Sequence, residues 1–126
     1  MSHYQENISS SQLSGVIDWQ RMHKVSMGDT RYQLKLLQMF VENAETYLAE
    51  IDSAIADNNY ETVVNISHKL KGVSSHLGVR YIPDIALQLE NRGMHSRLEK
   101  TEFLLADLEW VLAEIRTLLA ELNSKA

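Results

Sequence analysis

The sequence predicts an all-α protein, an up-and-down antiparallel four-helix bundle with a short extra helix at its N-terminal side. Apolar residues recur at alternating spacings of three and four over several long segments, which is the period of an amphipathic helix. No segment alternates apolar and polar residues as a half-buried strand does. The 126 residues include only one proline and five glycines, so few points in the chain interrupt a helix.

The length and composition fit one small domain. Hydrophobic residues make up 44% of the chain and charged residues 23%, which is close to the average for globular proteins. Residues 1–15 are rich in serine, glutamine and asparagine and show no periodicity. We therefore expect a flexible leader over residues 1–15 and the helical bundle over residues 16–126.

Charge and cysteine usage exclude several classes of function. The formal net charge of −5 does not favour nucleic-acid binding, which needs a basic surface. The chain has no cysteine, so it forms neither disulfides nor thiolate metal sites. No segment approaches the roughly 18 consecutive apolar residues of a membrane span, and the first residues lack the apolar core of a signal peptide. We expect a cytoplasmic monomer that binds neither nucleic acid nor membrane.

The first two helices are recognised by their capping residues. Asp18 can cap a short helix that runs to about Met27 and is ended by Gly28. The second helix is long, begins after Asp29, and is broken at residues 57–59. Its core-facing apolar positions are Leu34, Leu37, Val41, Ala44, Leu48, Ile51 and Ile55.

Three more helices follow. One runs from about Tyr60 to Gly78, a shorter one from the region of Pro83 to Gly93, and the last over about residues 97–123. Burial of one apolar side chain contributes about 1.5–3 kcal/mol, so these apolar faces decide the fold. They consist of Val63, Ile66, Leu70, Val73 and Leu77; of Ile82, Ile85, Ala86 and Leu89; and of Leu104, Leu108, Val111, Ile115, Leu118 and Leu122.

The helix that begins near Tyr60 carries an unusual polar face. Each residue turns a helix by about 100°, which directs His68 away from the apolar face and into solvent. Lys71 and Gly72 lie one turn further on, and Ser75 lies two turns further on the same side. An interior helical glycine costs roughly 0.5–1 kcal/mol relative to alanine. Because the apolar pattern continues beyond Gly72, we interpret this glycine as open access to the imidazole.

These residue types suit phosphoryl chemistry. A neutral imidazole is a nucleophile at cellular pH. Lys71 could donate a charged hydrogen bond to a phosphoryl group on His68, an interaction of about 1.5–3 kcal/mol. Most exposed histidines have no role, however, and a helical adaptor without chemistry explains the fold equally well. The adaptor does not explain an interior glycine beside an exposed His-Lys pair.

The segment around His68 resembles the signature of histidine-containing phosphotransfer (HPt) domains. That signature is a small residue, histidine, any residue, leucine, lysine and glycine, with a second glycine six residues later. Residues 67–72 (SHKLKG) and Gly78 match it. The Gly28-Asp29 and Leu89-Glu90 pairs also resemble the family, and the likeness extends over roughly residues 17–122.

The resemblance implies a function and partners. His68 would accept a phosphoryl group, through Nε2, from an aspartate of a response-regulator receiver domain and pass it to another receiver. A hybrid sensor histidine kinase is a further possible partner. The receiver would bring Mg²⁺, so this chain would need no cofactor of its own. It would be a carrier without ATP-binding or autokinase activity.

The resemblance also assigns roles to individual side chains. Lys71 would neutralise the phosphoryl oxygens, and Gly72, Lys69 and Ser75 would provide access and docking. A polar side chain of the next helix would accept the other imidazole proton and so set the tautomer. Counting along the family pattern without gaps puts Glu90 at this position, where a glutamine is usual, and Gln88 is the fallback. Periodicity places both on the flanks of their helix and does not choose between them.

Rival chemistries lack their motifs. Di-metal carboxylate bundles need Glu-x-x-His pairs. Three residues before His23, His68, His76 and His95 stand Gln20, Asn65, Val73 and Arg92, so we expect no metal site. The dimerisation helix of a histidine kinase usually has an acidic residue after the histidine, where this chain has Lys69.

Two further features have alternative interpretations. Leu36, Met39 and Phe40 add apolar positions to the second helix, either as a wide core face or as part of a receiver-docking patch. His76 lies on the same helix as His68 but has no Lys-Gly pair after it, so we expect a structural or incidental residue.

Overall fold

The computed structural model describes residues 15–124 of the chain. The predicted leader, apart from Gly15, lies outside the described residues. Within them the only strand-like feature is an isolated bridge between Ile17 and Val79. The helices are α2 (Trp19–Ser26), α3 (Thr30–Ala56), α4 (Tyr60–Leu77), α5 (Ile82–Met94) and α6 (Glu102–Ser124). The predicted all-α class is confirmed.

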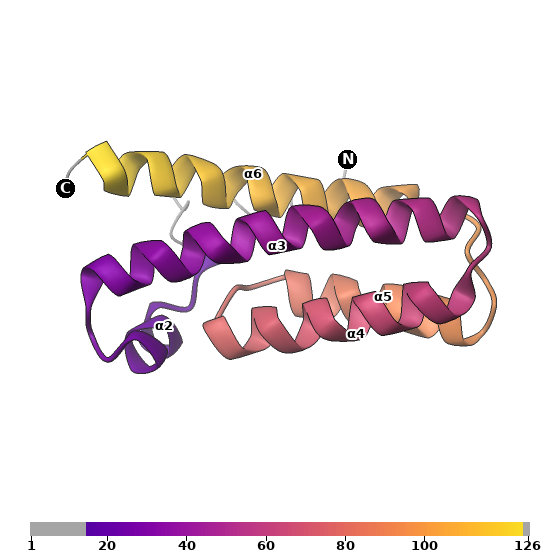
Figure 1. Ribbon diagram of the computed structural model, residues 1–126, viewed down its shortest axis with the longest axis horizontal. Coiled ribbons are helices and arrows are strands. Elements are labelled where there is room, and N and C mark those ends of the chain that lie inside the picture. The colour runs from indigo at the N-terminus through magenta and orange to yellow at the C-terminus, as the bar shows by residue number, and fades with distance from the viewer. Residues whose placement is uncertain (1–14, 125–126) are drawn as a thin grey trace.

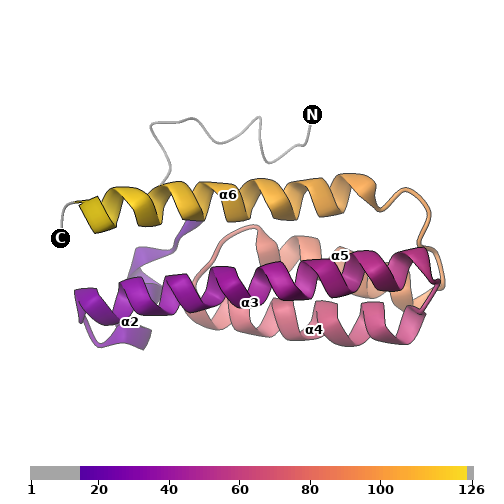
Figure 2. The same ribbon diagram turned by 45° about the horizontal axis from the view of Figure 1, so that its top comes forward.

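The four longer helices form an antiparallel up-and-down bundle (Figure 1). Around the bundle, α3 packs against α4, α4 against α5, α5 against α6, and α6 against α3. Figure 2 shows the two longest helices, α3 and α6, running along the length of the molecule, with α4 below α3 and α5 behind α3. The short α2 contacts α3 and α4 at one end, as predicted. The most extensive contact joins α4 and α5, the pair that builds the site described below.

Three helices begin at side-chain caps, of which Asp18 and Asp29 were predicted and Asn59 was predicted only as part of the break after the second helix. Asp18, Asp29 and Asn59 each accept a hydrogen bond of 3.1 Å from the backbone N–H three residues later. Such a cap contributes typically about 1 kcal/mol. At the other end of α4, Gly78 adopts the left-handed conformation with φ of 79°. Glycine takes this conformation at no steric cost, so α4 ends where predicted.

The buried core follows the predicted apolar faces, with one exception. Side chains of all four long helices contribute to a single large cluster. Val73, predicted to face the core, is instead 37% exposed. It lies at the outer margin of the α3–α4 contact, where the two helices leave a groove.

Two helix ends differ from prediction. The cap of α2 is Met27, which is left-handed with φ of 53°, and Gly28 follows it with φ of 75°. The last helix begins at Glu102 and not near Arg97. The residues between the end of α5 and Glu102 form turns, in which the Arg97 N–H donates to the carbonyl of Arg92.

Gly93 does not end its helix, because α5 continues to Met94. This glycine is required by packing. A Cβ at this position would lie 2.8 Å from Cγ2 of Val64 and 3.3 Å from the carbonyl oxygen of Tyr60, both on α4. Gly93 therefore allows the close approach of α5 to α4, the two helices that position the site.

Replacing Gly93 with alanine should destabilise the bundle by about 1–3 kcal/mol, because the added methyl group overpacks the α4–α5 contact. Urea unfolding followed by far-UV circular dichroism measures the effect. Gly72→Ala is the matched control, since a Cβ at Gly72 meets no atom within 4 Å. Equal stabilities of the two variants would contradict the packing argument.

Candidate functional site

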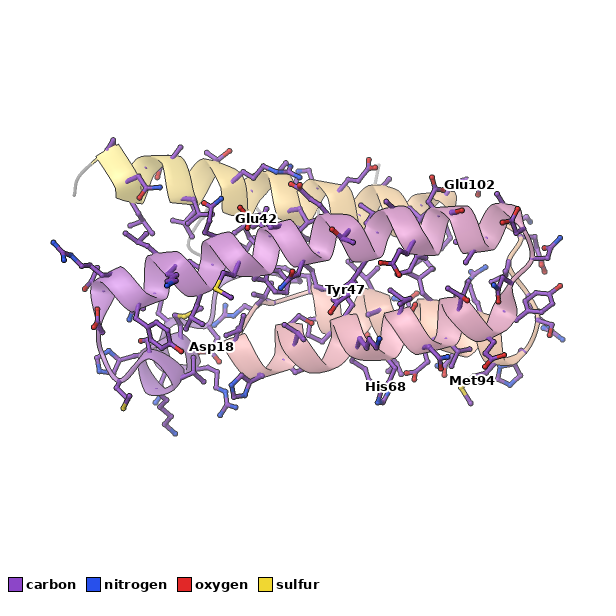
Figure 3. The ribbon with its side chains drawn as sticks, viewed as in Figure 1. Asp18, Glu42, Tyr47, His68, Met94 and Glu102 are labelled. Atoms are coloured by element: carbon purple, nitrogen blue, oxygen red, sulfur yellow. The ribbon has the colours of Figure 1, made fainter. Side chains whose placement is uncertain are left out.

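His68 stands on the solvent side of α4. Its side chain is 67% exposed, whereas the neighbouring Ser67 is fully buried. The buried face of α4, which includes Ile66 and Leu70, fixes the rotation of the helix and so directs the imidazole outward. Figure 3 shows the ring projecting from α4 on the side away from α3 and α6. The predicted exposure of this histidine is observed.

Glu90 on α5 reaches the ring from the side. Its Oε2 lies 2.8 Å from His68 Nδ1, and its Oε1 accepts a 2.8 Å hydrogen bond from Lys71 Nζ. The Glu90 side chain is only 11% exposed, against 29% for Lys71. With Nδ1 protonated, the ring donates to the carboxylate and Nε2 keeps its lone pair. No described residue forms a hydrogen bond with Nε2.

The charge of Glu90 is stabilised by its neighbours. The hydrogen bond from Lys71 is the largest influence, and it lowers the pKa of the Glu90 carboxyl below its ordinary value. Burial acts in the opposite direction, and the His68 hydrogen bond adds a smaller lowering. Glu90 is therefore ionised at cellular pH, although it lies largely within the α4–α5 contact.

This lowered pKa predicts how stability depends on pH. A carboxyl whose pKa is lower in the folded state stabilises the fold above its unfolded pKa and loses this contribution as the pH falls through the folded value. Wild type should therefore exceed Glu90→Gln in unfolding free energy by more at pH 6 than at pH 3. Urea unfolding of both proteins at the two pH values measures this difference. A difference that does not change with pH would contradict the assignment.

The structure distinguishes between Glu90 and Gln88, the two candidates on α5 for the side chain that orients the imidazole. Gln88 lies one turn from Asp84 and donates a 3.4 Å hydrogen bond to its carboxylate. Of the two, only Glu90 has a hydrogen bond to His68. The ion pair between Lys71 and Glu90 was not predicted, because no sequence pattern within either helix reports the register between them.

The other predicted residues lie on the same helix as His68. Lys69, Gly72 and Ser75 are exposed on α4. A Cβ at Gly72 would meet no atom of this chain within 4 Å, so the fold itself does not require a glycine there. His76 lies further along α4, where its carbonyl accepts a 2.9 Å hydrogen bond from Arg21 Nε of α2.

An apolar groove runs beside Gly72 between α3 and α4. Its volume is about 360 Å³, and Met39 and Val73, at 48% and 37% exposed, are its most open apolar residues. Phe40 is buried in the core, so the wide-core interpretation holds for this residue. The groove is lined by Leu36, Met39, Phe40, Asn43, Gly72, Val73, His76 and Leu77.

The described residues offer no metal centre and no membrane span. No group of three or more histidine, aspartate or glutamate side chains in residues 15–124 is arranged to hold a metal ion. None of the described helices combines the length and apolar character needed to cross a bilayer.

Comparison with known proteins assigns the family. The family described as "Hpt domain" matches residues 35–125, which contain the whole of α4 and α5. The chain belongs to the Hpt domain family. The hydrogen-bonded group of His68, Lys71 and Glu90 thus lies on α4 and α5 of an Hpt domain.

This Hpt domain is similar to two phosphorelay intermediate proteins. It is 26% identical over 92 residues to the phosphorelay intermediate protein YPD1 of Candida albicans, covering 71% of this chain and 50% of the relative. It is 24% identical over 96 residues to the phosphorelay intermediate protein rdeA of Dictyostelium discoideum, covering 76% of this chain and 38% of the relative. The chain thus spans half or less of the length of these relatives.

Solved structures share the fold of this Hpt domain. Histidine-containing phosphotransfer protein B of Pseudomonas aeruginosa superposes with a TM-score of 0.78 at 20% identity, covering 88% of this chain and 96% of the other. Ypd1 of Saccharomyces cerevisiae, solved with the receiver domain of its downstream response regulator Ssk1, gives 0.59 at 20% identity and covers 86% and 89%.

Proposed function

We propose that this Hpt domain carries a phosphoryl group on His68, accepting it from a receiver aspartate and passing it to another receiver. The observation that carries this proposal is the exposed imidazole whose Nδ1 is held by Glu90 while Nε2 has no hydrogen-bond partner among the described residues. The phosphorelay roles in the names of both curated relatives support it. So does the Ypd1 complex with a receiver domain.

The chemistry follows from this arrangement. The Nε2 lone pair of His68 forms an N–P bond while the aspartyl O–P bond breaks in line, and the electron pair of that bond returns to the receiver carboxylate. The ring gains positive charge, and the Glu90 carboxylate against Nδ1 stabilises it. Lys71 supplies the cation nearest the phosphoryl oxygens. The receiver contributes Mg²⁺, so the Hpt domain is a positioned nucleophile and not an ATP-using kinase.

We propose that the receiver docks over the groove between α3 and α4. The groove is apolar, it adjoins Gly72, and exposed apolar surfaces of this kind mark partner sites. Lys69 and Ser75, which are exposed on α4, would lie in the same contact with the receiver. We place this exchange in the cytoplasm, which fits a chain without cysteine.

Phosphoryl transfer from a labelled receiver tests the proposal. The Hpt domain is incubated with phosphorylated receiver domains, and the label that it acquires should be labile in acid and stable in base, as expected for phosphohistidine. ATP alone should give no label. Binding of receivers without any transfer of label would support the alternative, a helical adaptor without chemistry.

A further inference from the structure

The Glu90 carboxylate serves two groups at once. One oxygen faces His68 Nδ1 and the other holds Lys71 Nζ, each at 2.8 Å. Before phosphorylation the site is balanced, because one carboxylate, one ammonium and a neutral ring sum to zero. Among the described residues, Glu90 forms ion pairs with no other basic side chain.

Phosphorylation of His68 disturbs this balance. A phosphoryl group carries about −1.5 to −2 charges at neutral pH, and it would stand on the nitrogen opposite to the one that faces Glu90. Lys71 must then be divided between two anions. Because Glu90 is largely buried in the α4–α5 contact, it cannot turn into solvent as a surface carboxylate could.

The same carboxylate also decides in which form the ring is left when the phosphoryl group departs. It keeps the proton on Nδ1, so that when the N–P bond breaks its electron pair returns to Nε2 and the ring leaves as a neutral imidazole. The phosphoryl group goes to a receiver aspartate or to water, and no further proton has to reach the ring.

We infer, on the basis of the proposed function, that Glu90 is a positioning residue that shortens the life of the phosphohistidine by holding Lys71 back from the phosphoryl group. The site is thereby suited to relaying a phosphoryl group rather than storing it. A glutamine at this position could still accept from Nδ1 through its amide oxygen. Its amide nitrogen, however, is a donor and would not hold the Lys71 ammonium.

The experiment compares the phosphorylated forms of wild type and Glu90→Gln after removal of the receiver. The variant should lose its label by hydrolysis roughly tenfold more slowly, which is the size expected for one charge-assisted hydrogen bond. Onward transfer of the phosphoryl group to a second receiver should also be slower in Glu90→Gln than in wild type. Glu109→Gln on the exposed face of α6 makes the same change of charge away from the site and should decay at the wild-type rate.

A double-mutant cycle separates Lys71 sharing from a general loss of structure. Lys71→Ala should shorten the phosphohistidine lifetime more in the Glu90→Gln background than in wild type, because only there is Lys71 fully available to the phosphoryl group. Equal effects in the two backgrounds, or equal lifetimes of wild type and Glu90→Gln, would overturn this inference. Failure of wild type to accept any label would instead overturn the proposed function.

Discussion

Replacing His68 with glutamine will abolish phosphoryl acceptance and leave the bundle folded. Glutamine has no ring nitrogen that could form the N–P bond. The substitution should disturb the fold little, because the His68 side chain is 67% exposed and forms its side-chain hydrogen bond with Glu90. Exposed substitutions usually change stability by about 0.5 kcal/mol or less. Acid-labile label transferred from a phosphorylated receiver measures acceptance, and circular dichroism measures helicity.

This variant also tests the other histidines of the chain. His68→Gln keeps His76, which lies two turns further along α4 and is exposed as well. The matched control is His76→Gln, which should still accept label on His68. The His76 ring contacts Arg21 and has no carboxylate partner like Glu90, and no Lys-Gly pair follows it, so we do not expect His76 to be the acceptor. Label retained by His68→Gln would show that another residue accepts the phosphoryl group.

Replacing Gly72 with glutamate should slow transfer by at least about a hundredfold, since a misplacement of 1 Å between reacting groups can cost this much. The side chain would project into the open space beside His68 and Lys71, where the receiver has to approach. Its charge would also repel the phosphoryl group. The bundle should remain folded, because a Cβ at Gly72 meets no atom of this chain within 4 Å and the position is exposed.

Gly72→Ala is the control for this prediction. An alanine in the helix interior should stabilise the bundle by about 0.5–1 kcal/mol, because α4 needs no unusual backbone conformation at this position. Its single methyl group should leave transfer much closer to wild type. Rapid-quench measurement of transfer from a phosphorylated receiver, together with urea unfolding, covers both expectations. Wild-type transfer rates in Gly72→Glu would refute the role of Gly72 in access.

Much of the fold could be predicted because its determinants are local. The caps at Asp18 and Asp29 act through hydrogen bonds within four residues of chain, so the sequence pattern reveals them. The exposure of His68 follows in the same way from the helical period and the apolar face of α4. Neither inference needs to know which helix lies beside which.

The errors occur where packing between helices overrides a local signal. Gly93 resembles a helix stop, but it is a contact point at which α5 approaches Val64. Val73 has the spacing of a core residue, yet the separation of α3 and α4 leaves it in the wall of a groove. The start of α6 was predicted about five residues early, because the turns before Glu102 are held by hydrogen bonds to α5.

By itself the sequence determined the helical class, the boundaries of most helices, and an exposed His68 with Lys71 and Gly72 on the same face, since each follows from a repeat or a cap within one helix. Helical periodicity did not choose between Glu90 and Gln88, and only the tertiary structure joins Glu90 to both His68 and Lys71. That contact depends on the register of α4 against α5, and residues 19 or 22 positions apart meet only after the core has packed.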